Sequence, residues 1–160
     1  VVAILKNRDR CDEAVAGAKQ NLTLNPAYGL NAIVIQLCHE QTGHFREAVA
    51  VARELNTNLP WLPAEALDEL DAAITAQGAQ GYWRTRLKWA QWWDRQDPHG
   101  KFHLAGYAAQ TGDIDLAFAT LDQAIRERNI YLPGLKIEPL FKPLRSDPRW
   151  ATVMRRMNFD

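Results

Sequence analysis

The chain of 160 residues lacks the features that mark several large classes of protein. Its only cysteines are Cys11 and Cys38, which cannot make a disulfide framework, so we interpret both as small buried apolar side chains. No apolar run approaches the roughly 20 residues that span a bilayer, and no secretory signal pattern opens the chain. Because the first residue is not Met, we interpret the sequence as a piece of a longer protein.

The chain also lacks an excess of either charge and any recognisable catalytic motif. Its 19 basic and 19 acidic residues balance, which argues against direct nucleic-acid binding and against a membrane-surface protein. It contains no glycine-rich phosphate loop, serine elbow or zinc-protease helix. His99 and His103 have the spacing of two metal ligands on one helix face, but no third ligand follows. We therefore expect no enzyme activity, no cofactor and no metal site.

One phrase occurs twice in the first 60 residues. Residues 9–26 read DRCDEAVAGAKQNLTLNP and residues 43–60 read GHFREAVAVARELNTNLP, with seven of eighteen positions identical. A looser third copy, QTGDIDLAFATLDQAI, begins at residue 110. The first two copies are 34 residues apart, which is the length of a helix-turn-helix repeat.

The residue types at the repeated positions have steric reasons. Gly43 and Gly112 follow the first helix of a pair, where a left-handed C-cap is least costly for glycine. Ala14, Ala48 and Ala117 stand where two helices must approach closely, so a larger side chain would wedge the helices apart. The prolines that close the first two copies cannot continue a helix. The repeat therefore specifies how helices pack against one another.

Extending this register predicts helices throughout the chain and no strands. A turn at Gly78 divides the third pair, and the segment GYWRTRLKWAQWWDRQ that follows departs from the repeat pattern. The fold class is all-α, a short right-handed solenoid of stacked helix pairs. The predicted helices span residues 1–6, 10–24, 29–41, 44–57, 63–76, 98–110 and 114–128. The middle segment, residues 79–97, departs from the consensus and leaves open whether the superhelix is regular there.

The last thirty residues break the period. Four prolines between residues 133 and 148 prevent a long helix there. Asp147 followed by Pro148 reads as an N-cap with proline at the first helical position, so a final helix starts at this point. We expect residues 130–160 to cap the repeats of residues 1–129 and to pack on the same domain, because a solenoid must cover its last apolar face. The apolar face of the final helix would be Trp150, Val153, Met154 and Met157.

These positions resemble the consensus of the tetratricopeptide repeat family, with a turn glycine, small residues at fixed steps and a closing proline. The tail, LKIEPLFKPLRSDPRWATVMRRMNF, resembles the C-terminal end of repeat regions in bacterial signalling and transcription-regulator proteins. Those proteins carry an N-terminal output domain, such as a winged-helix DNA binder, a kinase or a nucleotide cyclase. The resemblance implies a regulatory or scaffolding module.

The resemblance also implies that the first helix of each pair lines a concave, mostly apolar groove. Such a groove suits a partner helix or an extended peptide. The alternative is that these side chains pack on one another or on the tail. The predicted groove residues are Leu30, Ile33, Leu37, Glu40, Gln41, Asp71, Thr75, His99, Phe102 and Gln110.

The tryptophan-rich segment is a second candidate surface. Large apolar side chains between residues 82 and 93 span more than half of a helix circumference, which is typical of a helix that is buried or lies at an interface. Basic residues among aromatics can also bind single-stranded nucleic acid, but this all-round apolar character argues against it. The predicted interface residues are Trp83, Trp89, Trp92, Trp93 and Arg86.

We expect the chain to be a protein–protein interaction or scaffolding module whose partner is a protein or peptide. One alternative is a homo-oligomerisation module in which either the truncated first helix or the Trp89–Trp93 surface pairs with a second copy. Another is a small-ligand sensor with a pocket between the tail and the concave face. The cytoplasm fits the cysteine usage, and the periplasm stays open if the parent protein is a membrane-bound regulator.

Overall fold

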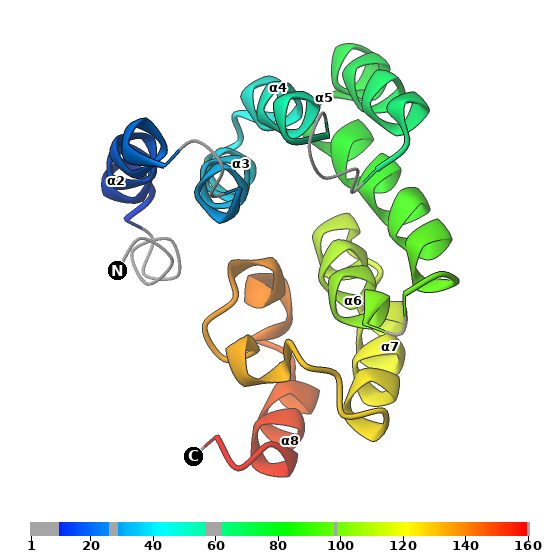
Figure 1. Cartoon of the computed structure of the whole chain (residues 1–160). Helices are drawn as coiled ribbons and strands as arrows, with labels where there is room; N and C mark the ends of the chain where they lie inside the picture. The colour runs from blue at the N-terminus through cyan, green and yellow to red at the C-terminus, as the bar shows by residue number, and fades with distance from the viewer. Residues whose placement is uncertain (1–9, 26–28, 57–61, 98, 160) are drawn as a thin grey trace. The chain divides into compact units, whose positions relative to one another are not determined.

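The computed structural model describes residues 10–25, 29–56, 62–97 and 99–159, and every element in these ranges is helical (Figure 1). The prediction of an all-α chain is confirmed for this part of the sequence. The predicted helix at residues 1–6 and the closing prolines Pro26 and Pro60 lie outside the described residues. The elements are α2 (Cys11–Leu24), α3 (Leu30–Thr42), α4 (Phe45–Asn56), α5 (Ala64–Asp94), α6 (Gly100–Thr111), α7 (Ile114–Arg126), η1 (Leu132–Gly134), η2 (Pro139–Leu144) and α8 (Pro148–Arg156).

The helix ends follow the local chemistry of the sequence. Gly43 and Gly112 have φ of 79° and 84°, the left-handed conformation that ends α3 and α6. Gly78, with φ of 59° and ψ of −137°, interrupts α5 at the predicted turn. The side chain of Asp147 accepts a hydrogen bond from the Arg149 amide, with Pro148 at the start of α8. These four predictions are confirmed.

The chain divides into two compact units, Val1–Tyr82 and Trp83–Asp160, and the boundary falls inside α5. The boundary also falls in the segment that departs from the repeat pattern. Five residues after the turn glycine, two of the repeats have alanine (Ala48 and Ala117), whereas this segment has Trp83. Each unit is described below by itself.

In the first unit, α2 packs on α3 and α3 packs on α4. Ala14 and Ala48 are fully buried, as close approach of these helices requires. The two arms of α5 on either side of Gly78 also come close together, because a Cβ atom on Gly81 would lie 2.3 Å from the Ala73 carbonyl oxygen. Small residues thus stand at the tightest helix contacts of this unit.

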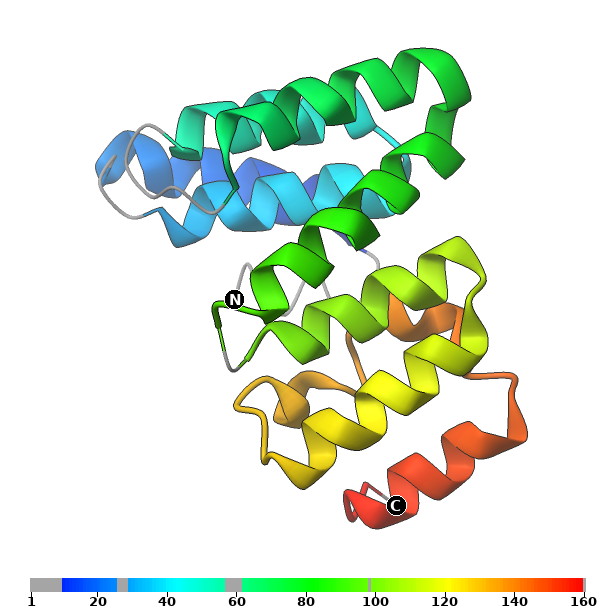
Figure 2. The same cartoon turned by 90° about the vertical axis from the view of Figure 1, so that its right-hand side faces the viewer.

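In the second unit, α6 packs on α7 on one side and on η2 on another (Figure 2). Ala117 is fully buried, like its counterparts in the first unit. The core is formed by α6, α7 and residues of the tail, which supplies large apolar side chains. These tail residues are Leu132, Leu135, Phe141, Leu144, Trp150 and Val153.

The tail consists of two 3-10 turns followed by the final helix α8. Asp115 on α7 pairs with Arg149 on α8 at 2.7 Å, and Asp122 pairs with Arg156, so residues 34 positions apart meet twice. These contacts hold α8 beside α7. The part of the tail before α8 forms the 3-10 turns η1 and η2, because Pro133, Pro139 and Pro143 exclude a continuous α-helix.

Candidate functional site

One face of α3 offers apolar side chains at helical spacing. Leu30, Ile33, Leu37 and Gln41 follow one another at intervals of three or four residues, which places them on the same face. Leu30 is 56% exposed, and the other three are half-buried. We call these four residues the α3 face. It contains four of the ten predicted groove residues.

Glu40, another predicted groove residue, is 4% exposed and does not lie on a surface. Its carboxylate accepts a hydrogen bond of 2.5 Å from the Tyr82 hydroxyl and one of 3.5 Å from the Gln36 amide. Tyr82 is itself fully buried and stacks on Phe45, with ring centroids 4.5 Å apart. A buried carboxylate needs such donors, because its desolvation would otherwise be costly. Glu40 thus connects α3 with α5 inside the first unit.

The predicted polar residues Asp71 and Thr75 are held by arginines of α4. Arg53 donates to Asp71 and to Asp68 at 2.8 Å each, and Arg46 donates to the Thr75 hydroxyl at 3.0 Å. Hydrogen bonds to these two carboxylates raise the pKa of Arg53 above its ordinary value. All of these side chains are near the solvent, so the contacts orient the side chains and contribute little stability.

On α6, the predicted groove residues face the tail. Phe102 is 4% exposed and lies 5.0 Å, edge to face, from the Phe141 ring. Gln110 donates to the Leu140 carbonyl at 2.9 Å. The His99 carbonyl accepts a hydrogen bond from Asn129 at 3.0 Å. Because η2 covers this side of α6, Phe102 belongs to the core and cannot line an accessible groove.

The tryptophan-rich segment divides into an inner and an outer part. Trp83 is buried and stacks on Tyr107 of α6 at 6.1 Å, and Arg86 lies over the same ring at 4.6 Å while donating to the Tyr107 hydroxyl. Trp83 is therefore inside the second unit, and Arg86 is half-buried and held against Tyr107. Trp89, Trp92 and Trp93 are also half-buried.

The outer part of the tryptophan segment is linked by aromatic and polar contacts. Trp89 and Trp92 meet edge to face at 5.7 Å, and the Lys88 ammonium lies 5.3 Å from the Trp89 ring centroid. The Trp93 indole donates to Asp97 at 3.2 Å. This part of α5 presents its tryptophans next to basic side chains.

Possible metal ligands do not cluster within the described ranges. No three His, Cys, Asp or Glu side chains there could hold a metal ion together. Cys11 and Cys38 are both buried and neither is in a disulfide. His39 and His44 meet edge to face at 6.0 Å, and the His44 Nδ1 atom lies 2.8 Å from the Thr42 hydroxyl. None of the helices in this part of the chain is both long enough and apolar enough to cross a membrane.

One surface was missed by sequence reasoning. Arg84, Lys88 and Arg95 are exposed along α5 and just after it. The signal was present in the sequence, because residues 72–93 contain no acidic residue although the chain has 19.

We compared the chain with family models, with curated proteins and with solved structures, and none of the three comparisons gave a match.

Proposed function

We propose that this chain is a protein-interaction module built from tetratricopeptide-like helix pairs, and that it binds its partner without catalysing a reaction. Two recurrent features support the repeat assignment: left-handed glycines at the ends of α3 and α6, and fully buried alanines five residues after each of them. The 34-residue spacing of the copies in the sequence supports it further.

The α3 face is the observation that carries the proposal. Leu30, Ile33 and Leu37 keep a row of aliphatic side chains at least partly in contact with solvent, while their neighbours Ile35 and Cys38 are buried. A row at intervals of three and four residues matches the spacing at which an amphipathic partner helix places its apolar anchors. At the end of the row, the Gln41 side-chain oxygen accepts a hydrogen bond from the Cys11 thiol at 3.5 Å, and its amide nitrogen would donate to a partner.

The resemblance of the tail supports a place for this module in the regulatory part of a bacterial signalling or transcription-regulatory protein. In such a protein the module would receive a partner and transmit the event to an output domain. Replacing Ile33 with Glu should then change the output of the intact protein while its cellular amount stays the same. An unchanged output in that variant would contradict the regulatory role.

Site-specific photo-crosslinking tests the α3 face directly. A photoreactive phenylalanine at position 33 or 37 should capture a partner in cells, because a bound helix would lie on both side chains. Leu24 supplies the matched control, since it is a leucine of the same unit, on α2, and is 81% exposed. Equal capture at positions 24 and 33 would mean that any exposed apolar side chain suffices, and the proposal would fail.

A further inference from the structure

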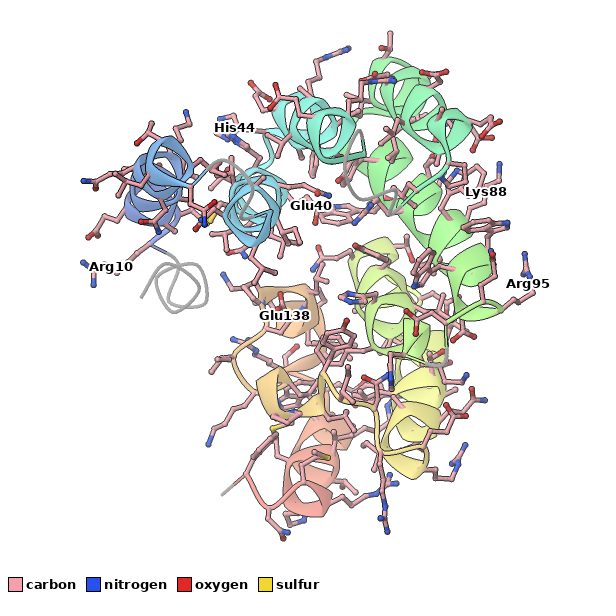
Figure 3. All side chains as sticks on the ribbon, in the orientation of Figure 1. Arg10, Glu40, His44, Lys88, Arg95 and Glu138 are labelled. Carbon is pink, nitrogen blue, oxygen red and sulfur yellow. The ribbon has the colours of Figure 1, made fainter. Side chains whose placement is uncertain are left out.

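The two cysteines of the chain lie together in the first unit, although they are far apart in the sequence. Cys11 is the first residue of α2, and Cys38 lies one turn before the end of α3. They form a buried cluster with Ala14, in which Cys11 is 7% exposed, Cys38 is 1% exposed and Ala14 is fully buried. Figure 3 shows sulfur, drawn in yellow, between α2 and α3. The packing of these two helices therefore brings both thiols to one place.

A hydrogen bond shows which part of α3 lies against Cys11. The Cys11 thiol donates to the side-chain oxygen of Gln41 at 3.5 Å. Gln41 follows Cys38 by three residues, so the two side chains lie on neighbouring turns of one side of α3. Bridged cysteines have Cα atoms about 4.4–6.8 Å apart. The absence of a large side chain at Ala14 allows the close approach of α2 and α3 that such a bridge needs.

We propose that Cys11 and Cys38 are a redox pair, which forms a reversible disulfide and thereby locks α2 to α3. The structure holds the reduced state, in which neither cysteine is in a disulfide. The oxidant would be a small-molecule disulfide such as oxidised glutathione, and a small thiol would reverse the reaction. This redox switch is independent of the α3 face and goes beyond the proposed function.

Two successive thiol–disulfide exchanges would form the bridge. Cys11 is the more exposed cysteine, so its thiolate attacks one sulfur of the small disulfide. The small S–S bond breaks, which leaves a mixed disulfide on Cys11 and one small thiolate. The Cys38 thiolate then attacks the Cys11 sulfur and displaces the second small thiolate. The two small thiolates take up the protons that the cysteines lose, and the two cysteines give up the two electrons that reduce the small disulfide.

The bridge has two structural consequences that can be measured. Amides of α2 exchange their hydrogens when the helix opens locally. A covalent link to α3 restricts this opening, so exchange in α2 should slow by about tenfold or more. The bridge also removes the thiol hydrogen that Gln41 accepts, so the surroundings of the Gln41 side-chain amide change.

The test incubates the full chain with mixtures of reduced and oxidised glutathione. By mass spectrometry the wild type should lose two hydrogen atoms and retain no glutathione, and a digest should contain one cross-linked peptide pair with Cys11 and Cys38. Cys38→Ala should stop at a mixed disulfide on Cys11, whereas Cys11→Ser should resist oxidation because its remaining thiol is 1% exposed. Exchange in α2 should slow in the oxidised wild type, recover with dithiothreitol, and show no response to the oxidant in Cys11→Ser.

Three outcomes would overturn the proposal: a wild type that keeps both thiols or stops at a mixed disulfide, a bridge that links two chains, and a bridge that leaves exchange in α2 unchanged. Cys11→Ala is the matched control for Gln41, because it removes the thiol donor without allowing a bridge. It should shift the Gln41 side-chain amide signals in nuclear magnetic resonance, as oxidation of the wild type should. The oxidised and reduced wild type can be compared directly, so the test stands even if a variant folds poorly.

Discussion

The helices α3 and α6 hold the same place in their helix pairs but have different surroundings. Both end in a left-handed glycine with similar backbone hydrogen bonds: the His44 amide donates to the His39 carbonyl at 2.9 Å, and the Asp113 amide donates to Ala108 at 3.0 Å. Four of the 13 residues of α3 are buried, whereas eight of the 12 residues of α6 are buried. The repeated pattern therefore determines how the two helices of a pair are joined, and it does not determine how much of the first helix is buried.

The difference arises from what covers each helix. Tail residues lie against α6, and Gly106 permits this contact because a Cβ atom there would lie 3.0 Å from Leu140. The buried side of α3 is more polar, since two of its four buried residues are Asn31 and Glu40. α6 therefore serves mainly to build a core, while α3 keeps one face at least partly exposed.

The largest expected effect tests this division of roles. Phe141→Ala should lower the free energy of unfolding by about 3–5 kcal/mol, because a fully buried ring that packs on Phe102 is replaced by a cavity. Leu37→Ala on the half-buried α3 face should cost only about 1 kcal/mol. Urea unfolding measures both. Similar losses in the two variants would show that α3 is as much a core helix as α6.

The second prediction concerns the buried alanines. Ala48→Leu and Ala117→Leu should each destabilise the protein by about 1–3 kcal/mol, because the helices cannot move apart without losing other contacts. Ala50 and Ala119 lie two residues further along and are exposed, so leucine at either position should change stability little. The comparison requires only thermal unfolding of the four variants. Tolerance of leucine at 48 but not at 117 would mean that the first unit is packed more loosely.

Much of the fold could be predicted because local chemistry determines it. The predicted helix at residues 10–24 is Cys11–Leu24 in the structure, and the one at 44–57 is Phe45–Asn56. Glycine at a left-handed position or aspartate before proline acts within a few residues of itself. Such features can be read without knowledge of the rest of the chain.

The candidate site was harder to predict because it depends on contacts between distant residues. Phe102 has the spacing of a groove residue, yet a tail segment about 40 residues away covers it. Glu40 looks like a surface carboxylate until Tyr82, 42 residues later, donates to it. Nothing in a 34-residue pattern specifies such partners. Helix periodicity predicts which side chains share a face and cannot predict what lies against that face.

The third prediction concerns the feature that the two helix pairs share most closely. Gly43→Ala and Gly112→Ala should each cost about 1 kcal/mol, because alanine resists the left-handed conformation. A Cβ atom would meet nothing within 4 Å at either glycine, so the cost is conformational and should be equal at both. Asparagine tolerates this conformation better and should lose less stability at both sites. Unequal alanine costs, measured by chemical unfolding, would show that the two turns differ in strain.

The smallest expected effect is a difference between the α3–α4 pair and the α6–α7 pair in how their stability depends on pH. Burial lowers the pKa of His39 below its usual value near 6.5, against an opposing effect of Glu47. The folded state therefore binds fewer protons than the unfolded state just below that pH, so stability should decline as the pH falls through about 6.5 and level off below the folded pKa. In the α6–α7 turn, Ala108 accepts the equivalent backbone hydrogen bond, so no histidine stands at the position that corresponds to His39.

His39→Ala makes the α3–α4 turn resemble the α6–α7 turn and should reduce this pH dependence. Urea midpoints at pH 7.5, 6.5 and 5.5 for the wild type and the variant provide the measurement. Hydrogen exchange should show where stability is lost: on acidification, amides of α4 should lose more protection than amides of α7. If both pairs lose protection equally in the wild type, the acid response lies outside the α3–α4 turn, and this difference between the pairs disappears.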